Sequence, residues 1–304
     1  TRLHPNVRSP LSYVITYGYI VDCTGTGKYQ INYELDKAEL LSGSVTNSEP
    51  NFQPYTESIL ATYNDMIIWN ITDSNNYEYD LRITTDVVSQ SYLLADINEN
   101  VGLSITEIGI VYPEIVNQFC NSQSDDGFIY IDPENQRIST IAQNIYNKAA
   151  TDNSLTVAKE LFIWLKSNTN YSYNTNSDKV KQATKTLEDE GGDCDDLSFL
   201  YISLCRAINI PARFIKGFLV EETNAVPHAW TEVFVGGDLG NSGWIPVECA
   251  GTANDAITEV NQNFAIETAE HLRLFTDDGS DESLNISLSG LSYKIYNQNR
   301  KVNA

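Results

Sequence analysis

The sequence GGDCDDLSFLYISLCRAINIPARFIKGF, residues 191–218, decides how this chain folds. Its middle part repeats apolar side chains every three or four residues, at Leu197, Leu200, Leu204 and Ile208. That spacing predicts a helix with a buried face. Pro211 cannot continue a helix, and the following ARFIKGFLV alternates like a strand. The stretch therefore predicts a buried helix that begins near Cys194 and leads into a sheet.

Cys194 is surrounded by aspartates, and their charge bears on what its thiol can do. The neighbours are Asp193, Asp195 and Asp196. A nucleophilic cysteine works as its thiolate, which nearby carboxylates disfavour. The other interpretations are a metal ligand and a structural buried thiol. A metal site needs further ligands such as histidine, and the neighbouring sequence has none. We interpret the aspartates as helix-start residues, because carboxylates there bind free N–H groups and the helix dipole.

Two later segments supply the other groups that thiol chemistry needs. Alternation in PHAWTEVFV places four side chains on one strand face: His228, Trp230, Glu232 and Phe234. The glycine-rich GGDLGNSG predicts a hairpin that brings GWIPVE back beside this strand, with Glu248 in reach of His228. An imidazole can take the thiol proton, and a carboxylate can fix the orientation of the imidazole. The backbone N–H of Cys194 would form part of an oxyanion hole.

At these residues the chain resembles the transglutaminase-like superfamily. The matching elements are Gly192-Asp193-Cys194, the helix and hinge in LCRAINIPARFIKGF, His228-Ala229-Trp230 with TEVFV, and GWIPVE ending at Glu248. They agree in order and spacing over residues 130–252. The resemblance implies a papain-like catalytic core of microbial or archaeal type. It also implies a Cys–His–acid triad that transfers acyl groups through a thioester, with Cys194 as nucleophile and His228 as base.

Glu248 departs from the family pattern, in which the third member is usually Asp. Glutamate carries the same charge on a longer arm, so it can orient His228 with adjusted geometry. The predicted function is cysteine-dependent acyl transfer or hydrolysis at an amide or isopeptide bond of a protein or peptide. Whether water or an amine accepts the acyl group stays open. The alternative is a non-catalytic surface-binding or adhesion module that retains the transglutaminase-like fold.

The predicted fold class is α+β, in three parts. Residues 1–125 are dense in Tyr, Ile, Val and Thr between turn sequences, which predicts a β-rich, sandwich-like N-terminal domain. Residues 126–252 form the transglutaminase-like catalytic core, with helices expected in DPENQRISTIAQNIYNKAA and SLTVAKELFIWLKSN. The polar stretch 120–127 is the candidate linker. Residues 253–304 are expected to be a C-terminal β extension that packs on the core.

The composition of the chain limits the classes of partner that it is expected to bind. The 304 residues include 41 acidic and 19 basic side chains, a formal net charge of −22. Nucleic acid binding needs clustered Lys and Arg, so nucleic acid is not expected. No apolar run reaches the roughly 18–20 residues of a membrane span, so membrane insertion is not expected either. We expect a protein or peptide substrate, no cofactor, and an extracellular or cell-surface location. The oligomeric state stays open.

For three further features a structural interpretation is favoured over a functional one or left open. His271, in AEHLRLF, is taken as a strand residue rather than a ligand. The acidic loop 276–283 lacks the full ligand pattern of an EF-hand, so an exposed loop is favoured over a calcium site. The five cysteines are too few and scattered for a disulfide scaffold, and a Cys23–Cys120 disulfide stays open.

Overall fold

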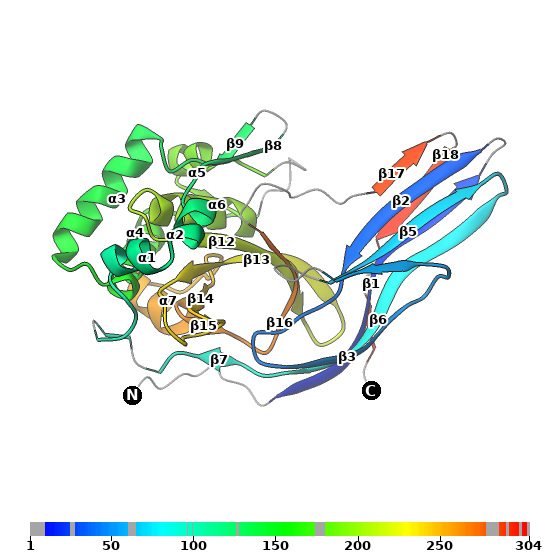
Figure 1. The fold of residues 1–304 in the computed structure, drawn as a ribbon, viewed down its shortest axis with the longest axis horizontal. Helices are drawn as coiled ribbons and strands as arrows, with labels where there is room; N and C mark the ends of the chain where they lie inside the picture. The colour runs from blue at the N-terminus through cyan, green and yellow to red at the C-terminus, as the bar shows by residue number, and fades with distance from the viewer. Residues whose placement is uncertain are drawn as a thin grey trace.

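The computed structural model describes residues 10–24, 28–59, 65–95, 97–98, 100–125, 128–173, 180–277, 286–289, 292–297 and 300–302. A strand-rich half and a half that combines helices with a sheet lie on opposite sides of the molecule (Figure 1). The α+β fold class is confirmed. The domain boundaries stay a prediction, and the structure differs from them at several points given below.

The strand-rich half contains two antiparallel sheets that pack face to face as a sandwich. The first has the order β18 (Ser292–Asn297), β1 (Leu11–Thr24), β6 (Tyr77–Ser89), β3 (Gly43–Pro50), and β19 (Arg300–Val302) also pairs with β1. The second has the order β17 (Ile286–Ser289), β2 (Tyr29–Asp36), β5 (Met66–Asp73), β4 (Thr56–Ser58). The predicted β-rich, sandwich-like character of this region agrees with these sheets.

Alternating side chains fill the space between the two sheets. Along β2 every second side chain is buried, namely Tyr29, Ile31, Tyr33 and Leu35. This is the pattern of a strand with one face in a core. The Tyr33 ring stacks on Trp69 of β5 with ring centroids 5.5 Å apart. Large aromatic side chains therefore hold this half together.

The C-terminal strands differ from the expected extension on the core. β18 and β19 pair with β1, and β17 pairs with β2, so all three belong to the sandwich. The last strand that belongs to the other, helix-containing half of the molecule ends at Asp277. Alternation identifies a strand but does not choose its partner, and here the open edges of β1 and β2 accept the last strands.

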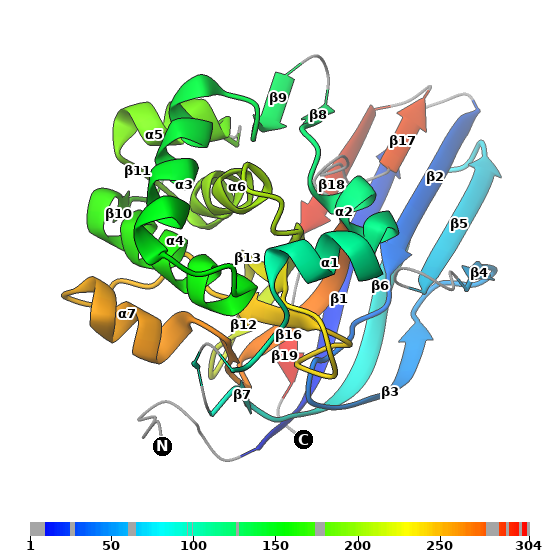
Figure 2. The same ribbon diagram turned by 60° about the vertical axis from the view of Figure 1, so that its left-hand side comes forward.

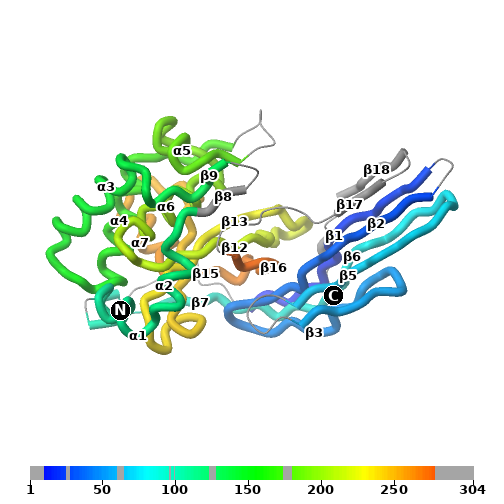
Figure 3. The backbone as a smooth tube through the Cα atoms, turned by 45° about the horizontal axis from the view of Figure 1, so that its top comes forward, coloured from blue at the N-terminus to red at the C-terminus, as the bar shows by residue number. Residues whose placement is uncertain are grey.

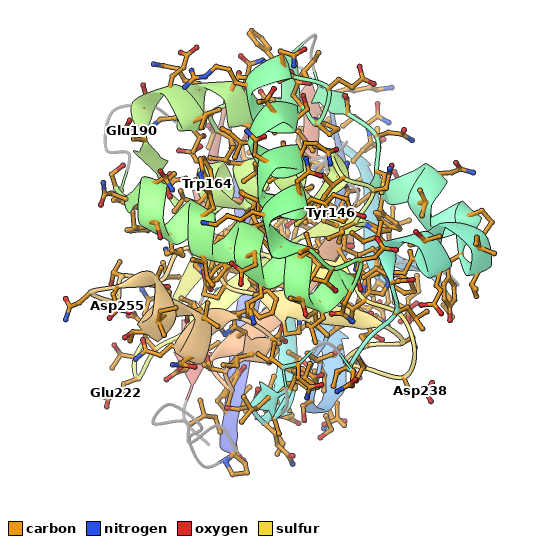
Figure 4. All side chains as sticks on the ribbon, turned by 90° about the vertical axis from the view of Figure 1, so that its left-hand side faces the viewer. Tyr146, Trp164, Glu190, Glu222, Asp238 and Asp255 are labelled. Carbon is orange, nitrogen blue, oxygen red and sulfur yellow. The ribbon has the colours of Figure 1, made fainter. Side chains whose placement is uncertain are left out.

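The other half has a four-stranded antiparallel sheet under a layer of helices. The strand order is β14 (Trp244–Val247), β13 (Ala225–Phe234), β12 (Ala212–Val220), β16 (His271–Asp277). The helices of this layer are α3 (Gln136–Ala149), α4 (Ser154–Asn168), α5 (Ala183–Asp189), α6 (Cys194–Arg206) and α7 (Ala256–Asn263). In Figure 2, α6 lies at the centre of the helical layer. Figure 4 looks onto the outer face of this layer, where Tyr146 of α3 and Trp164 of α4 are labelled.

Helix α6 is the centre of this half. Every residue from Asp196 to Arg206 is buried, and the helix packs on β12 and β13. The predicted helix, its start at Cys194 and its end before Pro211 are confirmed. Arg206 donates through Nε and Nη2 to the carbonyl of Ala212, and through Nη1 to the carbonyl of Asn121. The buried guanidinium thus fixes the turn that carries the chain from helix to sheet.

Two short helices occupy a region predicted to be β-rich. They are α1 (Ile105–Val111) and α2 (Pro113–Phe119), and their buried residues Ile108 and Phe119 pack with Phe234 and Trp244 of the catalytic half. Ser104 and Glu107 form a capping box at the start of α1, a helix signal that is readable in the sequence. The predicted linker, 120–127, instead contains β8 (Gln123–Asp125), which pairs with β9 (Phe128–Ile131).

Two small pairings and a shared core complete the fold. β7 (Tyr92–Leu93) pairs with β15 (Ile266–Glu267), and β10 (Asn170–Tyr171) pairs with β11 (Gly191–Gly192). The two halves meet where β12, β13 and β16 reach the sandwich (Figure 3). Their contribution to the sandwich core is Phe218, Val220, Ala225 and Leu272. The backbone of Glu39 also exchanges two hydrogen bonds with Arg273 of β16.

None of the described helices is long and apolar enough to cross a membrane. All five cysteines are free, so the Cys23–Cys120 disulfide that the sequence left open is not formed. Cys205 lies in the core as expected.

We expect Arg206→Met to lower the free energy of unfolding by about 2–4 kcal/mol, because it leaves buried carbonyl groups without their donor. Urea denaturation measures this change. Lys185→Met is the matched control, since it removes a cation from an exposed helical pair with Asp189 and should leave the free energy of unfolding nearly unchanged. Equal losses in the two variants would contradict the structural role of Arg206.

Candidate active site

Cys194 is the first residue of α6, and a capping box holds the turn around it. The Asp193 carboxylate accepts from the N–H of Asp196 at 3.4 Å, and the Asp196 carboxylate accepts from the N–H of Asp193 at 3.2 Å. Asp196 also accepts from the N–H of Lys181 at 2.7 Å. Asp193 and Asp196 are therefore the helix-start residues that the sequence predicts. Helix-start N–H groups next to Cys194 favour negative charge on its sulfur.

Gly192 is required by the close packing of this turn. A Cβ atom at this position would overlap the side chain of Asp196. The Gly192 carbonyl accepts from the N–H of Ser172 at 2.9 Å, within the β10–β11 pair. This pair brings Tyr171 beside the nucleophile. Burial raises the pKa of Tyr171 to about 12, and the negative charges of Cys194, Asp193 and Glu248 add to the shift.

His228 and Glu248 come together as the predicted hairpin requires. β13 and β14 pair with Thr231 opposite Val247, which brings the next residue, Glu248, to the His228 side of the sheet. His228 Nε2 lies 2.6 Å from Glu248 Oε2, and both residues are only 8% exposed. A carboxylate can only accept, so His228 Nε2 carries the proton. The other ring nitrogen, Nδ1, is left for the thiol.

The Cys194 thiol and the His228 imidazole are close enough for each to shift the pKa of the other. Burial raises the pKa of Cys194, while His228 and the backbone N–H of Ala229 act in the opposite direction. Burial alone would lower the pKa of His228, but Glu248 and Cys194 outweigh it and raise that pKa to about 10. His228 is thus a strong base for a thiol that does not ionise readily without it.

Three donors surround the buried carboxylate of Glu248. Oε2 accepts from His228 and, at 3.0 Å, from His271 Nε2, while Oε1 accepts from the N–H of Ala250 at 2.7 Å. Burial acts to raise the pKa of Glu248, but the two histidines hold it well below its usual value. Glu248 is therefore an ionised acid in a fixed orientation.

His271 is the site residue that the sequence interpretation missed. It begins β16, as a strand residue was expected to, yet its imidazole points at Glu248. Its place depends on the pairing of β16 with β12. Nothing in the local sequence signals that pairing, because the partner strand lies about fifty residues earlier in the chain.

Asp195 differs from its two neighbours. The Cys194 thiol donates to its Oδ1 at 3.7 Å, and its Oδ2 lies 3.9 Å from the Lys216 ammonium. Asp195 lies in the first turn of α6, as the sequence predicts, but its carboxylate takes no part in the capping box and faces the thiol instead. Burial raises the pKa of Asp195, Lys216 opposes this, and a less readily ionised carboxyl opposes the thiolate less.

A buried network of charges supports the ring that lies beside His228. Trp230 stacks on His228 with centroids 5.9 Å apart, and its Nε1 donates to Glu267 at 2.9 Å. Arg273 binds both Glu267 and Glu232, and Glu232 also binds Arg213. One buried arginine, Arg273, and one partly buried arginine, Arg213, thus balance two buried glutamates. Their positive charges hold the pKa of Glu232 below its usual value despite complete burial.

Lys166 fixes the loop after Glu248 from the other side. Its buried ammonium donates to the carbonyls of Cys249 at 2.9 Å and Gly251 at 2.6 Å. Glu259 lies 3.8 Å from the same ammonium and accepts from the N–H of Ala253. This loop presents the N–H of Ala250 to Glu248.

The donor atoms of His228, Glu248 and His271 lie within 4.8 Å of one another, which makes them the one group of metal-ligand type in the described part of the chain. Two histidines and a carboxylate can bind zinc or iron. The 2.6 Å and 3.0 Å contacts are hydrogen-bond lengths, however, so the three side chains bind each other. The acidic loop considered for calcium falls mostly outside the described residues, from 278 onward.

A thiol at the start of a central helix, facing an imidazole and a carboxylate on an antiparallel sheet, defines a papain-like site. Residues 139–249 match the model of the transglutaminase-like superfamily, which confirms the sequence resemblance over this part of the chain. No curated protein matches the chain.

Several solved structures are similar to the chain at low identity. A crystal structure of a "putative cysteine protease" from Cytophaga hutchinsonii is 15% identical, covers 98% of this chain and 92% of that chain, and has a TM-score of 0.59. The periplasmic domain of TgpA from Pseudomonas aeruginosa is 14% identical, covering 80% of this chain and 88% of that chain, with a TM-score of 0.39. Red sea bream transglutaminase is 12% identical, covering 81% of this chain and 49% of that chain, with a TM-score of 0.33.

The lowered pKa of Glu248 predicts how stability depends on pH. A carboxylate with a depressed pKa stabilises the fold above its unfolded pKa of 4.5, and this contribution is lost as the pH falls below that value. We expect Glu248→Gln to remove a slope of about 1.4 kcal/mol per pH unit below 4.5. Urea denaturation of both proteins at several acidic pH values measures the difference, in which other carboxylates cancel. Parallel curves would contradict the assignment.

Proposed function

We propose that this chain is a cysteine-dependent enzyme that cleaves an amide or isopeptide bond of a protein or peptide through a thioester. The acyl group then passes to water or to an amine. One observation supports this above all: the Cys194 thiol, the His228 imidazole and the Glu248 carboxylate come together at one site, where His228 and Glu248 form a 2.6 Å hydrogen bond. These are the groups, in the order, that nucleophilic thiol catalysis needs.

In the first step His228 Nδ1 takes the proton of the Cys194 thiol, and the sulfur attacks the carbonyl carbon of the substrate. The tetrahedral intermediate collapses as the imidazolium gives that proton to the leaving nitrogen, which leaves an acyl thioester on Cys194. In the second step His228 takes a proton from water or from an amine, and this nucleophile attacks the thioester. The proton returns to the sulfur, which restores the free enzyme.

Glu248 and the start of α6 stabilise the charges that develop. Glu248 accepts the Nε2–H of His228, so it fixes the tautomer and stabilises the imidazolium. The backbone N–H of Cys194 is suited to the oxyanion of the intermediate. Tyr171 is a candidate second donor, because its raised pKa keeps its hydroxyl protonated beside Cys194.

The alternative, a non-catalytic binding module, would not require the thiol, the imidazole and the acid to lie together at one site. The geometry favours the enzyme for that reason. We further propose an extracellular or cell-surface location and a protein or peptide substrate, in line with the net charge of −22. Nucleic acid is disfavoured as a partner by the same charge.

Alkylation by iodoacetamide tests the reactive pair. We expect Cys194 to react rapidly at about pH 7 and His228→Ala to slow it about 100-fold or more, because burial without the imidazole leaves little thiolate. Mass spectrometry with Cys194→Ser as control assigns the labelled residue. A wild-type rate no faster than that of a free thiol of pKa about 8.5 would sink the proposal.

Product analysis tests the reaction itself. Incubation with a protein mixture should give new N-termini if water is the acceptor, or incorporation of a fluorescent primary amine if an amine is. Both products should vanish in Cys194→Ser and fall at least about 100-fold in His228→Ala, because the nucleophile and its base act as a unit. Absence of both products with the wild-type protein, over a range of substrate proteins, would favour the binding module.

A further inference from the structure

His271 makes a contact whose consequence goes beyond the triad. The Glu248 side chain has one more rotatable bond than aspartate, so a carboxylate at its end can turn unless other groups hold it. Oε1 is held by the N–H of Ala250 and Oε2 is shared by His228 and His271. Of these donors, His271 alone comes from β16, on the far side of the sheet from β14. The acid is therefore held from two directions.

The proton on His271 Nε2 can be assigned from its partners. Glu248 carries the charge and only accepts, so Nε2 must donate. At the other side of the ring, Nδ1 lies 2.9 Å from the Thr268 hydroxyl, which also contacts Glu270 at 3.0 Å. Whether the Thr268 hydroxyl donates to His271 Nδ1 or to Glu270, His271 Nε2 keeps its proton. The donor to Glu248 is thus present in both protonation states of His271.

Packing fixes the direction of this donor. The His271 ring meets Trp230 edge-on, with centroids 4.8 Å apart and planes at 76°. Trp230 is itself held by its bond to Glu267. The backbone N–H of His271 donates to the carbonyl of Thr268 at 3.0 Å, so the same residue anchors main chain and ring. His271 is only 5% exposed.

We propose that His271 is a positioning residue of this site, whose Nε2–H holds Glu248 in the orientation that reaches His228 and so allows glutamate to act as the third member. This role rests on the proposed function, because positioning matters only if His228 activates Cys194. The His271 ring also lies edge-on to His228, with centroids 5.8 Å apart, but its hydrogen bond toward the site goes to Glu248, through which we assign its effect.

Two substitutions separate the donor from the packing. His271→Leu removes the donor and keeps an apolar side chain of similar bulk, while His271→Gln keeps an N–H near the position of Nε2. We expect His271→Leu to slow alkylation of Cys194 at about pH 7 by about 10- to 100-fold, the effect of losing a hydrogen bond to a charged group. His271→Gln should stay within about threefold of wild type.

Leu272→Ala is the matched structural control. Leu272 is the next residue of β16 and is buried in the core shared with the sandwich, away from Glu248. This variant should lose stability in urea while its alkylation rate stays at the wild-type value. A loss of rate in Leu272→Ala equal to that in His271→Leu would show a general effect of β16 and overturn the proposal.

A double-mutant cycle with Glu248→Ala tests whether His271 acts through the acid. In that background His271 has nothing to position, so adding His271→Leu should change the rate by less than about twofold. Multiplying losses would overturn the proposal. If Glu248→Ala does not fold, as judged by circular dichroism, the contrast between His271→Leu and His271→Gln decides, and equal slowing in both overturns it.

Failure of the proposed function would look different. In that case wild-type alkylation does not depend on His228. The positioning role of His271 is then tested by a measurement that does not need a reactive thiol. The short bond between His228 and Glu248 should give a far-downfield proton resonance for Nε2–H. Its loss in His271→Leu and its retention in His271→Gln support the role of His271, and its retention in both variants overturns that role.

Discussion

The buried charge of Glu248 is the constraint on which the site depends. A carboxylate removed from water must be compensated by hydrogen bonds or by opposite charge. Glu248 obtains this compensation from three separate parts of the chain: β13, β16 and the loop that follows β14. Buried cations further away hold these parts in turn. Lys166 binds carbonyl groups of the loop, and Arg273 forms ion pairs with Glu232 and Glu267. Glu248 therefore fixes two strands and a loop relative to one another.

This arrangement explains how the Cys194 thiol could ionise although carboxylates surround it. Asp193 and Asp196 direct their oxygens to backbone N–H groups, so their charge is largely used by the turn. Asp195 does face the sulfur, but burial weakens its ionisation and Lys216 lies on its other side. The thiolate then depends on His228, whose positive charge is stabilised by Glu248. The carboxylates around Cys194 and the imidazole of His228 act in opposite directions on the ionisation of the thiol.

Local patterns predicted the parts of the fold that are continuous in sequence. The spacing of Leu197, Leu200 and Leu204 gave a correct helix, and alternation with a glycine-rich turn gave the β13–β14 hairpin and the approach of Glu248 to His228. The capping box at Ser104 was readable but was outweighed by the β-rich composition around it.

Pairings between distant segments could not be obtained in this way. His271 has the sequence context of an ordinary strand residue, and only the pairing of β16 with β12 brings it to the site. The same holds for β17 to β19, whose alternation identifies strands without naming β1 and β2 as partners. Side-chain period depends on local geometry, whereas strand order depends on the whole chain.

The return of β17 to β19 to the sandwich has a consequence for how the protein is made. The catalytic half is built from one continuous segment that ends at Asp277, and the sandwich strands lie on both sides of it in the chain. A ribosome releases β1 and β2 first and their last partners after the whole catalytic segment. Domains generally fold as they emerge, so we expect the catalytic segment to fold while the edges of β1 and β2 are still unpaired. Exposed strand edges attract other chains, and a nascent chain of this protein would carry that risk until its final strands are synthesised.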